Sequence, residues 1–402
     1  MLATVNLSDN SLAKGLPPNR CNTLSATLTV NEWGISPMSF PDDAAVVMTD
    51  APPASSFDTA AVPSRDAPGH RPIPELDVAV VICAYTQDRW EQTVAAINSV
   101  LSQRPGPAHV LLIVDHNPAL AERARQELPG VTVLESEGAP GLSEARNTGL
   151  RASRFGITAF LDDDAAARPG WLASLVAPYA DRDVVATAGS IHPRWLAARP
   201  RWLPKEFFWV VGCSYQGLPL TTGPVRNPIG ANMSLQTASA ISAGGFFSAI
   251  GRAGGKLRNC EETELAIRLS TRQPGSRIIY NPEAAVDHNV GPERVIFRYF
   301  VRRCWHEGLS KANVVMLTGA RLGLMAERRQ VLSVLPVAML RELKQSMTGD
   351  LGAVSRAGAI MVGLAAATCG FMFRWANLLV TREVLARAND RRSLDPRLMP
   401  KA

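Results

Sequence analysis

Three aspartates stand side by side, Asp162, Asp163 and Asp164, directly after the apolar stretch "GITAFL". Adjacent carboxylates repel one another, and a fold tolerates them when a divalent cation lies among them. Mg²⁺ and Mn²⁺ prefer oxygen ligands and often take one or two carboxylates together with substrate phosphates. We therefore predict a metal site here, followed by a turn of small residues, "AAARPG". An exposed acidic loop or the first turn of a helix is the alternative interpretation.

A second pair of acids, Glu261 and Glu262, begins the stretch "EETELAIRLS". The dipole of a helix stabilises carboxylates in its first turn, and this alone accounts for one glutamate. It does not account for the glycines before them, which let a large ligand approach the backbone closely. These glycines are Gly244, Gly245, Gly251, Gly254 and Gly255. We predict a flexible loop that leads into a helix beside a ligand site.

Both acidic groups need a scaffold, and alternating strand and helix patterns begin at Asp77. Short apolar runs rich in Val, Ile and Leu predict buried strands, and apolar residues at helical spacing predict helices between them. The predicted strands cover residues 77–85, 108–117, 131–137 and 156–164, and the predicted helices cover 87–103, 118–129 and 141–153. This alternation indicates an α/β fold with a parallel sheet and helices on both faces.

The ends of the predicted strands form a common edge of the sheet. Ligands of open α/β sheets bind beyond the carboxyl ends of the strands. The residues at these ends are Ala84 and Tyr85, then Asp115, then Glu135 to Glu137, then Asp162 to Asp164. Acids at three of the four ends predict an acidic rim where a ligand binds.

The order and spacing of these motifs resemble the family 2 glycosyltransferases of the GT-A fold over about residues 77–312. The segments that carry the resemblance are "VVICAYTQDRWEQTVAAINSVLSQ", "LLIVDHN", "PGLSEARNTGLRAS", "AFLDDD", "GANMS", "GGF" and "EETEL". The resemblance implies a Rossmann-like, mostly parallel sheet flanked by helices, with a helical C-terminal extension. It also implies a bacterial enzyme of polysaccharide biosynthesis that transfers a sugar from a nucleotide-diphosphate sugar.

The resemblance also implies roles for individual residues. It implies a Mn²⁺ or Mg²⁺ ion on Asp162, Asp164 and His288, which would neutralise the charge of the leaving diphosphate. It implies contacts to the nucleotide sugar, with a UDP-sugar favoured, from Ala84, Tyr85, Arg89, Asp115, Arg146, Asn147 and Asp163. It places Gly230, Asn232, Gly244 and Gly245 on the acceptor side.

An acceptor hydroxyl is a weak nucleophile and needs a general base. Glu262, where the family usually has Asp, is the expected base, and Glu261 is the second catalytic candidate, with support of the helix start as its alternative role. One displacement would then invert the anomeric carbon. The acceptor class stays open among a glycan, a lipid-linked precursor and another cell-envelope precursor.

The C-terminal region is basic and partly apolar. From Gly291 to Ala402 there are 18 Lys and Arg against 8 Asp and Glu, about +10, which leaves about −4 elsewhere (24 against 28). The stretch "RRQVLSVLPVAMLRELKQSM" predicts an amphipathic helix with a kink at Pro336. The 17 uncharged residues Ala357–Phe373, with arginines at both ends, predict a helix lying peripherally on an anionic inner leaflet. A single membrane span and a soluble packing helix are the alternatives.

Three regions follow: a mostly disordered lead-in (1–73), the catalytic domain (74–312), and a basic, membrane-associating helical region (313–402). Six scattered cysteines and no signal-peptide pattern indicate the cytoplasm, at the inner face of the plasma membrane. A nucleotidyltransferase acting on sugar phosphates is one alternative, although "CAYTQDRW" lacks the expected glycine-rich loop. A non-catalytic lipid- or nucleic-acid-binding protein is another, suggested by the net charge of +6. No nucleic-acid motif is present, so we expect no nucleic-acid partner.

Overall fold

The computed structural model describes residues 76–248 and 260–393, with side chains described for 77–248 and 260–381. The predicted lead-in over residues 1–73 lies outside the described residues. The same holds for most of the predicted glycine-rich loop, including Gly251, Gly254 and Gly255.

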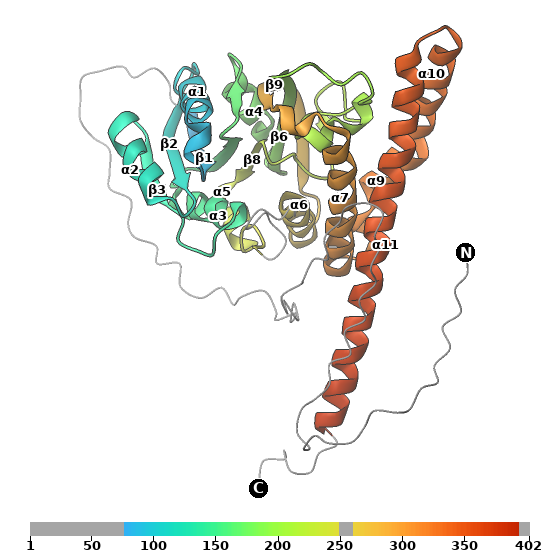
Figure 1. The fold of residues 1–402 in the computed structure, drawn as a ribbon. Helices are drawn as coiled ribbons and strands as arrows, with labels where there is room; N and C mark the ends of the chain where they lie inside the picture. The colour runs from blue at the N-terminus through green and yellow to red at the C-terminus, as the bar shows by residue number, and fades with distance from the viewer. Residues whose placement is uncertain (1–75, 249–259, 394–402) are drawn as a thin grey trace, which may run out of the picture. The chain divides into compact units, whose positions relative to one another are not determined.

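The four predicted strands form the parallel half of one sheet (Figure 1). They are β1 (Leu76–Ala84), β2 (Pro107–Val114), β3 (Thr132–Glu135) and β4 (Ile157–Asp162), in the order β3-β2-β1-β4. The predicted helices between them are α1 (Trp90–Leu101), preceded by η1 (Gln87–Arg89), α2 (Pro118–Glu127) and α3 (Leu142–Ala152). The predicted α/β alternation is therefore confirmed for this half.

The other half of the sheet is mixed. Its strands are β5 (Ala165–Ala167), β6 (Val184–Trp195), β7 (Gly223–Pro224), β8 (Asn232–Gln236) and β9 (Arg277–Val290). β8 runs antiparallel to both β4 and β6, whereas β6 and β9 are parallel. Short helices complete this half, namely α4 (Trp171–Val176), η2 (Ala177–Ala180), η3 (Lys205–Val211), α5 (Thr237–Ser242), α6 (Glu261–Arg272) and η4 (Pro292–Arg294).

One local prediction was wrong, because the small residues after the aspartates are not a simple turn. Ala165–Ala167 form β5, which pairs antiparallel with β9 so that Ala165 lies opposite His288. Alanine has little intrinsic preference for strands, but the free edge of β9 supplies ladder hydrogen bonds that outweigh it. This pairing brings the aspartate run beside β9.

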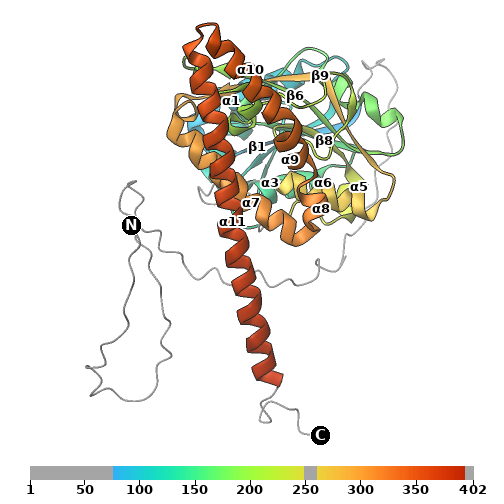
Figure 2. The same ribbon diagram turned by 90° about the vertical axis from the view of Figure 1, so that its right-hand side faces the viewer.

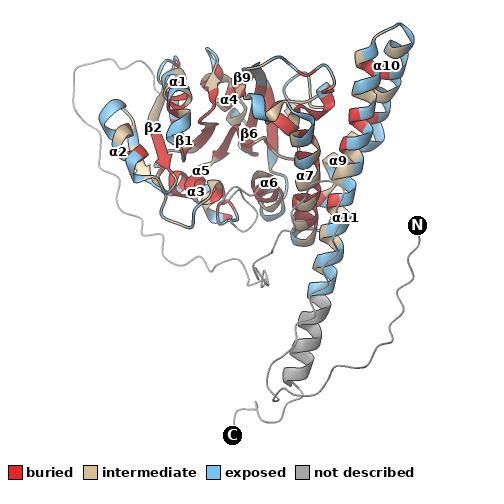
Figure 3. Cartoon of the chain, in the orientation of Figure 1, coloured by how far each residue is buried: buried red, intermediate tan, exposed pale blue. Residues whose placement is uncertain are grey.

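The sheet is buried on both faces, as the colouring in Figure 3 shows. Val80 and Ile82 of β1 join one core cluster, and the alternating Ala79 and Val81 join the other, as the two-residue period of a strand requires. The first cluster packs against α1, α2 and α4. The second packs against α3, α5 and α6, which lie together along one side of the sheet in Figure 1.

The C-terminal region is helical, as predicted. It contains α7 (Phe297–Thr318), α8 (Ala320–Gly323), α9 (Met325–Arg329), the π-helical turn η5 (Gln330–Val334), α10 (Leu335–Met347) and α11 (Leu351–Ser393). The interruption precedes the predicted kink, because Pro336 lies in the first turn of α10, where its missing N–H costs nothing. The proposed boundary at residue 312 falls inside α7.

α11 packs closely along α7 (Figure 2). Gly308 of α7 and Gly370 of α11 lie at the crossing, where a Cβ on either would collide with the backbone of the partner helix. Arg374 Nε donates to Asn313 Oδ1 at 2.8 Å along the same seam. Within the described part of the chain, Leu351–Thr381 is the segment long and apolar enough to cross a membrane.

Candidate active site

Asp164, the last of the aspartate run, is buried among two arginines and a histidine. His288 Nε2 lies 3.1 Å from its Oδ1, Arg294 Nη2 donates to its Oδ2 at 3.0 Å, and Arg89 Nη1 lies 3.2 Å from Oδ2. Burial alone would raise the pKa of Asp164, but these partners, His288 foremost, lower it well below its usual range. The group is therefore held as a carboxylate.

Asp163, the middle residue, is buried with one oxygen uncompensated. Arg89 Nη1 donates to its Oδ1 at 3.1 Å, while Oδ2 has no hydrogen-bond partner among the described residues. Burial raises the pKa of Asp163 to about 7, and the adjacent charge of Asp164 adds to this effect. An unpartnered buried oxygen is uncommon in folded proteins and indicates a bound group that would complete it.

Asp162 ends β4 and keeps 28% of its side chain exposed. Its Oδ1 accepts a hydrogen bond from Arg146 Nη2 at 3.3 Å. The buried Arg146, from α3, also donates to the Gly230 carbonyl at 3.0 Å and to Glu261 Oε1 at 2.9 Å. The missing side chain at Gly230 makes room for this guanidinium. Arg146 therefore joins the end of β4 to the start of α6.

Asp162, Asp164 and His288 offer donor atoms that all lie within 4.8 Å of one another. The pairing of β5 with β9 produces this arrangement, and the Asn289 N–H donates to the Asp164 carbonyl at 2.8 Å. Carboxylate oxygens and a neutral imidazole nitrogen are ligands for divalent metals such as Mn²⁺.

His288 is buried, and its other ring nitrogen, Nδ1, lies 3.8 Å from Cys213 Sγ. A partner on the second nitrogen fixes the orientation of an imidazole that binds a metal through the first. Asp163, whose Oδ2 has no partner among the described residues, stands between Asp162 and Asp164 in the chain, and the donor set has the chemistry of a divalent-cation site. The residues present therefore fit the predicted cation.

Glu261 and Glu262 occupy the first turn of α6, in the position that the sequence predicts. Glu261 is buried and does more than support the helix start, because one oxygen accepts from Arg146 and Oε2 has no partner in the described residues. Glu262 is half-buried. Burial, followed by the charge of Glu261, raises the pKa of Glu262 to about 7. A carboxyl of that pKa can accept a proton near neutral pH.

The predicted nucleotide side lies at the ends of β1 and β2. The Asp115 N–H donates to the Ala84 carbonyl at 2.8 Å, and Asp115 Oδ2 accepts from the Gly141 N–H at 2.9 Å. The Ala84 side chain is buried, whereas Tyr85 is 56% exposed. The guanidinium of Arg89 lies 5.6 Å from the Tyr85 ring centroid. Tyr85 and Asp115 thus stand at the rim, and Ala84 offers only backbone.

Two predicted ligand residues already use their side-chain amides in bonds within the protein. Asn147 Nδ2 donates to the Phe246 carbonyl at 2.8 Å, and the Phe246 N–H donates to Asn147 Oδ1 at 2.7 Å. Gly245, at φ +67°, leaves room for this amide. Asn232 is fully buried, bonded to Trp171 Nε1 and to two carbonyls. Contacts from these two amides to a ligand stay predictions and would require existing bonds to break.

Ion pairs and one hydrogen bond join eight of the predicted site residues around the aspartate run. They are Arg89, Arg146, Asp162, Asp163, Asp164, Gly230, Glu261 and His288. Sequence reasoning missed Arg294 and Cys213, which contact Asp164 and His288. Arg294 follows His288 by six residues, after a Pro-led turn that returns it to the acid. That basic residue in "DHNVGPER" was the available signal.

Comparisons with known proteins match this chain to one family. Residues 79–241 match the model of Glycosyl transferase family 2. The chain is 33% identical over 240 residues, 59% of its own length and 76% of the other's, to the glucosyl-dolichyl phosphate glucuronosyltransferase of Haloferax volcanii. It is 25% identical to the succinoglycan biosynthesis protein ExoM of Rhizobium meliloti, over 58% of this chain and 73% of that protein.

Among solved structures, the fold is similar to a mannosyltransferase from Pyrobaculum calidifontis in complex with GDP-Man and Mn²⁺. The TM-score is 0.48 at 17% identity, and the match covers 74% of this chain and 88% of the other.

Proposed function

Since the chain belongs to glycosyl transferase family 2 and is a glycosyltransferase, we propose that it works by a single inverting displacement. The donor is a nucleotide-diphosphate sugar, with a UDP-sugar favoured, and the acceptor is a hydroxyl group. The observation that carries the proposal is the convergence of Asp162, Asp164 and His288, together with Arg146, which joins Asp162 to Glu261, the neighbour of Glu262 in the first turn of α6.

Asp162, Asp164 and His288 would hold the divalent cation, Mn²⁺ or Mg²⁺. Once bound, such a cation neutralises the negative charge that grows on the leaving diphosphate. Arg89 and Arg294 already lie within 3.2 Å of Asp164, so they add positive charge to the same place. Asp115 and Tyr85, at the neighbouring strand ends, face the region where the nucleotide would bind.

Glu262 would act as the general base. It takes the proton of the acceptor hydroxyl while that oxygen forms its bond to the anomeric carbon and the bond to the diphosphate breaks. A carboxyl with a pKa of about 7 is largely ionised just above neutral pH and still basic enough to accept the proton. Arg146 bridges Asp162 and Glu261, and thereby sets the distance between the donor and acceptor sides.

The acceptor would be a glycan or a lipid-linked precursor at the cytoplasmic face of a membrane. One relative's name specifies a dolichyl phosphate substrate and another specifies succinoglycan synthesis. The α10–α11 hairpin exposes apolar side chains, notably Met347 at 87% and Leu351 at 84%.

We favour peripheral attachment over a membrane span. The inner face of α11 is packed on α7, a helix that carries the charged residues Glu307 and Lys311. A span of α11 would draw these charges into hydrocarbon, which is costly.

A panel of nucleotide sugars with Mn²⁺ or Mg²⁺ tests the proposal. Donor hydrolysis and thermal shift should identify one donor, and EDTA should abolish turnover. Asp164→Asn should reduce transfer to background and weaken donor binding, since it removes a ligand charge, while circular dichroism shows a folded chain. Turnover that survives EDTA would exclude the metal role, and nucleotidyl transfer to a sugar phosphate would exclude the reaction.

A further inference from the structure

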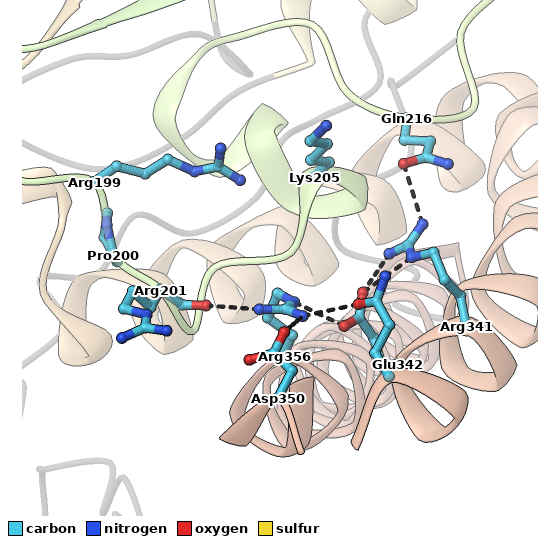
Figure 4. A pocket seen from close by; sticks show the side chains of 10 residues that line it. Arg199, Pro200, Arg201, Lys205, Gln216, Arg341, Glu342, Asp350 and Arg356 are labelled. Atoms are coloured by element: carbon cyan, nitrogen blue, oxygen red, sulfur yellow. Dashed lines mark hydrogen bonds and ion pairs between the residues drawn. The ribbon is translucent and has the colours of Figure 1, made fainter. Parts of the chain in front are cut away.

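A charged cavity of about 600 Å³ lies away from the candidate active site, between the segment 199–205 and the α10–α11 hairpin (Figure 4). Its lining is Arg199, Pro200, Arg201, Lys205, Gln216, Arg341, Glu342, Gln345, Asp350 and Arg356. Five of these residues are basic and two are acidic, so the lining carries a net charge of about +3.

The acids of this cavity are already compensated. The buried Glu342 accepts from Arg341 Nη2 at 2.5 Å through one oxygen and from Arg356 Nε at 2.7 Å through the other. Arg341 Nη1 also donates to the buried Glu206 at 2.9 Å, and Arg356 Nη2 donates to Asp350 at 2.8 Å. Two of the five basic side chains, Arg341 and Arg356, are therefore already paired with acids of the protein.

The other three, Arg199, Arg201 and Lys205, are exposed and form no ion pair with any described residue. Figure 4 shows the Arg199 side chain extending toward Lys205 across the cavity. Its guanidinium lies 5.2 Å from the Phe208 ring centroid, which restricts its position. Gathered like charges without a counterion favour an anion, and the planar guanidinium fork matches a phosphate group.

The neighbourhood of the cavity separates a lipid from a free anion. The cavity extends to the turn between α10 and α11, where Asp350 lines it and the flanking residues Met347 and Leu351 are exposed at 87% and 84%. A free phosphate gains nothing from an apolar neighbour, whereas a phospholipid would place its phosphate in the cavity and its chains against this apolar turn.

We propose that this cavity binds the phosphate of an anionic membrane phospholipid. The inference rests on the peripheral membrane attachment proposed above and is independent of the sugar-transfer chemistry. It assigns to Arg201 and Lys205 a role in selecting lipid, while the exposed Met347 and Leu351 at the α10–α11 turn supply the remaining contact.

The test compares two double variants of the full chain. Arg201→Gln with Lys205→Gln removes two cavity charges. Arg154→Gln with Arg182→Gln removes two exposed charges elsewhere that form no ion pair with a described residue. Sedimentation is measured with vesicles of phosphatidylcholine alone and of phosphatidylcholine mixed with phosphatidylglycerol. The cavity double variant should lose about 10- to 30-fold in affinity for the anionic vesicles, and the control double variant should lose less than about threefold.

Several outcomes overturn the proposal. Equal losses in both double variants would mean general electrostatic attraction, and unchanged binding of the cavity variant would mean no lipid site. Inorganic phosphate serves as a lipid-free probe. If it raises the melting temperature of the unaltered protein but not of the cavity variant, and vesicle binding is unaffected, the site binds free anions.

Transfer to a water-soluble acceptor without vesicles should be the same in all three proteins, since no altered residue lies in the candidate active site. Failure of every protein to bind any vesicle would refute the membrane attachment and this cavity together. Loss of transfer in the unaltered protein would instead refute the proposed reaction.

Discussion

Two clusters of acids and arginines in this chain look alike in composition and differ in completeness. The hairpin cluster comprises Glu206, Arg341, Glu342, Asp350 and Arg356; the site cluster comprises Arg89, Arg146, Asp162, Asp163, Asp164, Glu261, His288 and Arg294. In the hairpin cluster, both oxygens of Glu206 and both of Glu342 accept from arginine. In the site cluster, Asp163 Oδ2 and Glu261 Oε2 have no partner within the described residues.

An orphaned buried acceptor costs about 1–3 kcal/mol, so a fold keeps one where a ligand repays it. In the hairpin cluster, arginines of the protein satisfy the buried carboxylate oxygens of Glu206 and Glu342, which is typical of a structural ion-pair network. The site cluster is left incomplete at Asp163, between two of the metal donors in the chain, and at Glu261, in the helix turn that carries Glu262. The presence of unpartnered carboxylate oxygens, more than the number of charges, therefore distinguishes the candidate binding site from the structural ion-pair network of the hairpin.

Of the substitutions that test the difference between the two clusters, Glu262→Gln is expected to have the largest effect, and that effect is on the transfer rate. Glu262→Gln keeps the size of the side chain and removes its basicity, so transfer should fall about 10²–10⁴-fold with donor affinity near that of the unaltered protein. Glu261→Gln should instead lower stability by about 1–3 kcal/mol, because Arg146 keeps its hydrogen bond and loses a counter-charge. Transfer rates, donor affinities and melting temperatures of both variants show which of the two glutamates is the general base.

An inactive Glu261→Gln beside an active Glu262→Gln would move the base by one residue. Normal turnover in both would remove α6 from the reaction altogether.

Glu342→Ala removes the central acid of the hairpin cluster. Each arginine keeps one other acid, Glu206 or Asp350, so the free energy of unfolding should fall by about 3 kcal/mol, while transfer stays within about twofold. Denaturant unfolding and a transfer assay measure the two quantities. The control is Glu122→Ala, an exposed glutamate of α2, expected to change stability by less than about 0.5 kcal/mol. Lost transfer with unchanged stability would place the hairpin in the catalytic site.

The smallest effect is expected in the pH dependence. Because the pKa of Glu262 is raised from 4.5 to about 7, transfer should fall about tenfold per unit below pH 7 and level off above it. A carboxyl with a raised pKa in the folded state stabilises folding most below pH 4.5, and this contribution is lost as pH rises to about 7. Rate and stability should therefore move in opposite directions over that interval. Glu262→Gln should abolish the trend in rate and weaken the trend in stability, of which Asp163, with its pKa also raised to about 7, keeps a share.

Rate profiles and unfolding measurements at several pH values in parallel provide the test. A rate that is level from pH 5 to 8 would show that Glu262 does not titrate in the reaction.

An element of this fold could be predicted from the sequence when the residues that specify it lie within one short segment, and not when its partner lies far along the chain. β1 to β4 and α1 to α3 were predictable because a continuous apolar run and a helical period lie within single segments. β5 was not, since its pairing partner β9 follows more than a hundred residues later. Asn232 likewise gave no local sign that it bonds Trp171, Ser190 and Ala284, which come from three separate segments.

The candidate site follows the same rule. Residue type identified the acids, because a run of carboxylates requires compensation wherever it folds, and the resemblance to family 2 glycosyltransferases added His288. The structure does bring them together. Residue type did not identify which cations compensate them: Arg294 reaches Asp164 through the turn at Pro292, and Arg89 reaches across from η1. The catalytic and metal-binding roles themselves stay predictions.

The glycine crossing of α7 and α11 bears on how this protein can be dissected. Gly308 and Gly370 let the two backbones meet, so removing α11 would uncover a bare backbone groove on α7 together with the Phe300 ring that α11 covers at Gly363. A chain truncated before α11 would expose the apolar surface of α7 and self-associate. Failure of such a chain to bind vesicles would therefore not show that the full chain lacks a lipid site. Membrane attachment is therefore separable from folding by substitutions that leave α11 in place, such as those on its outer face at Met361 or Met372.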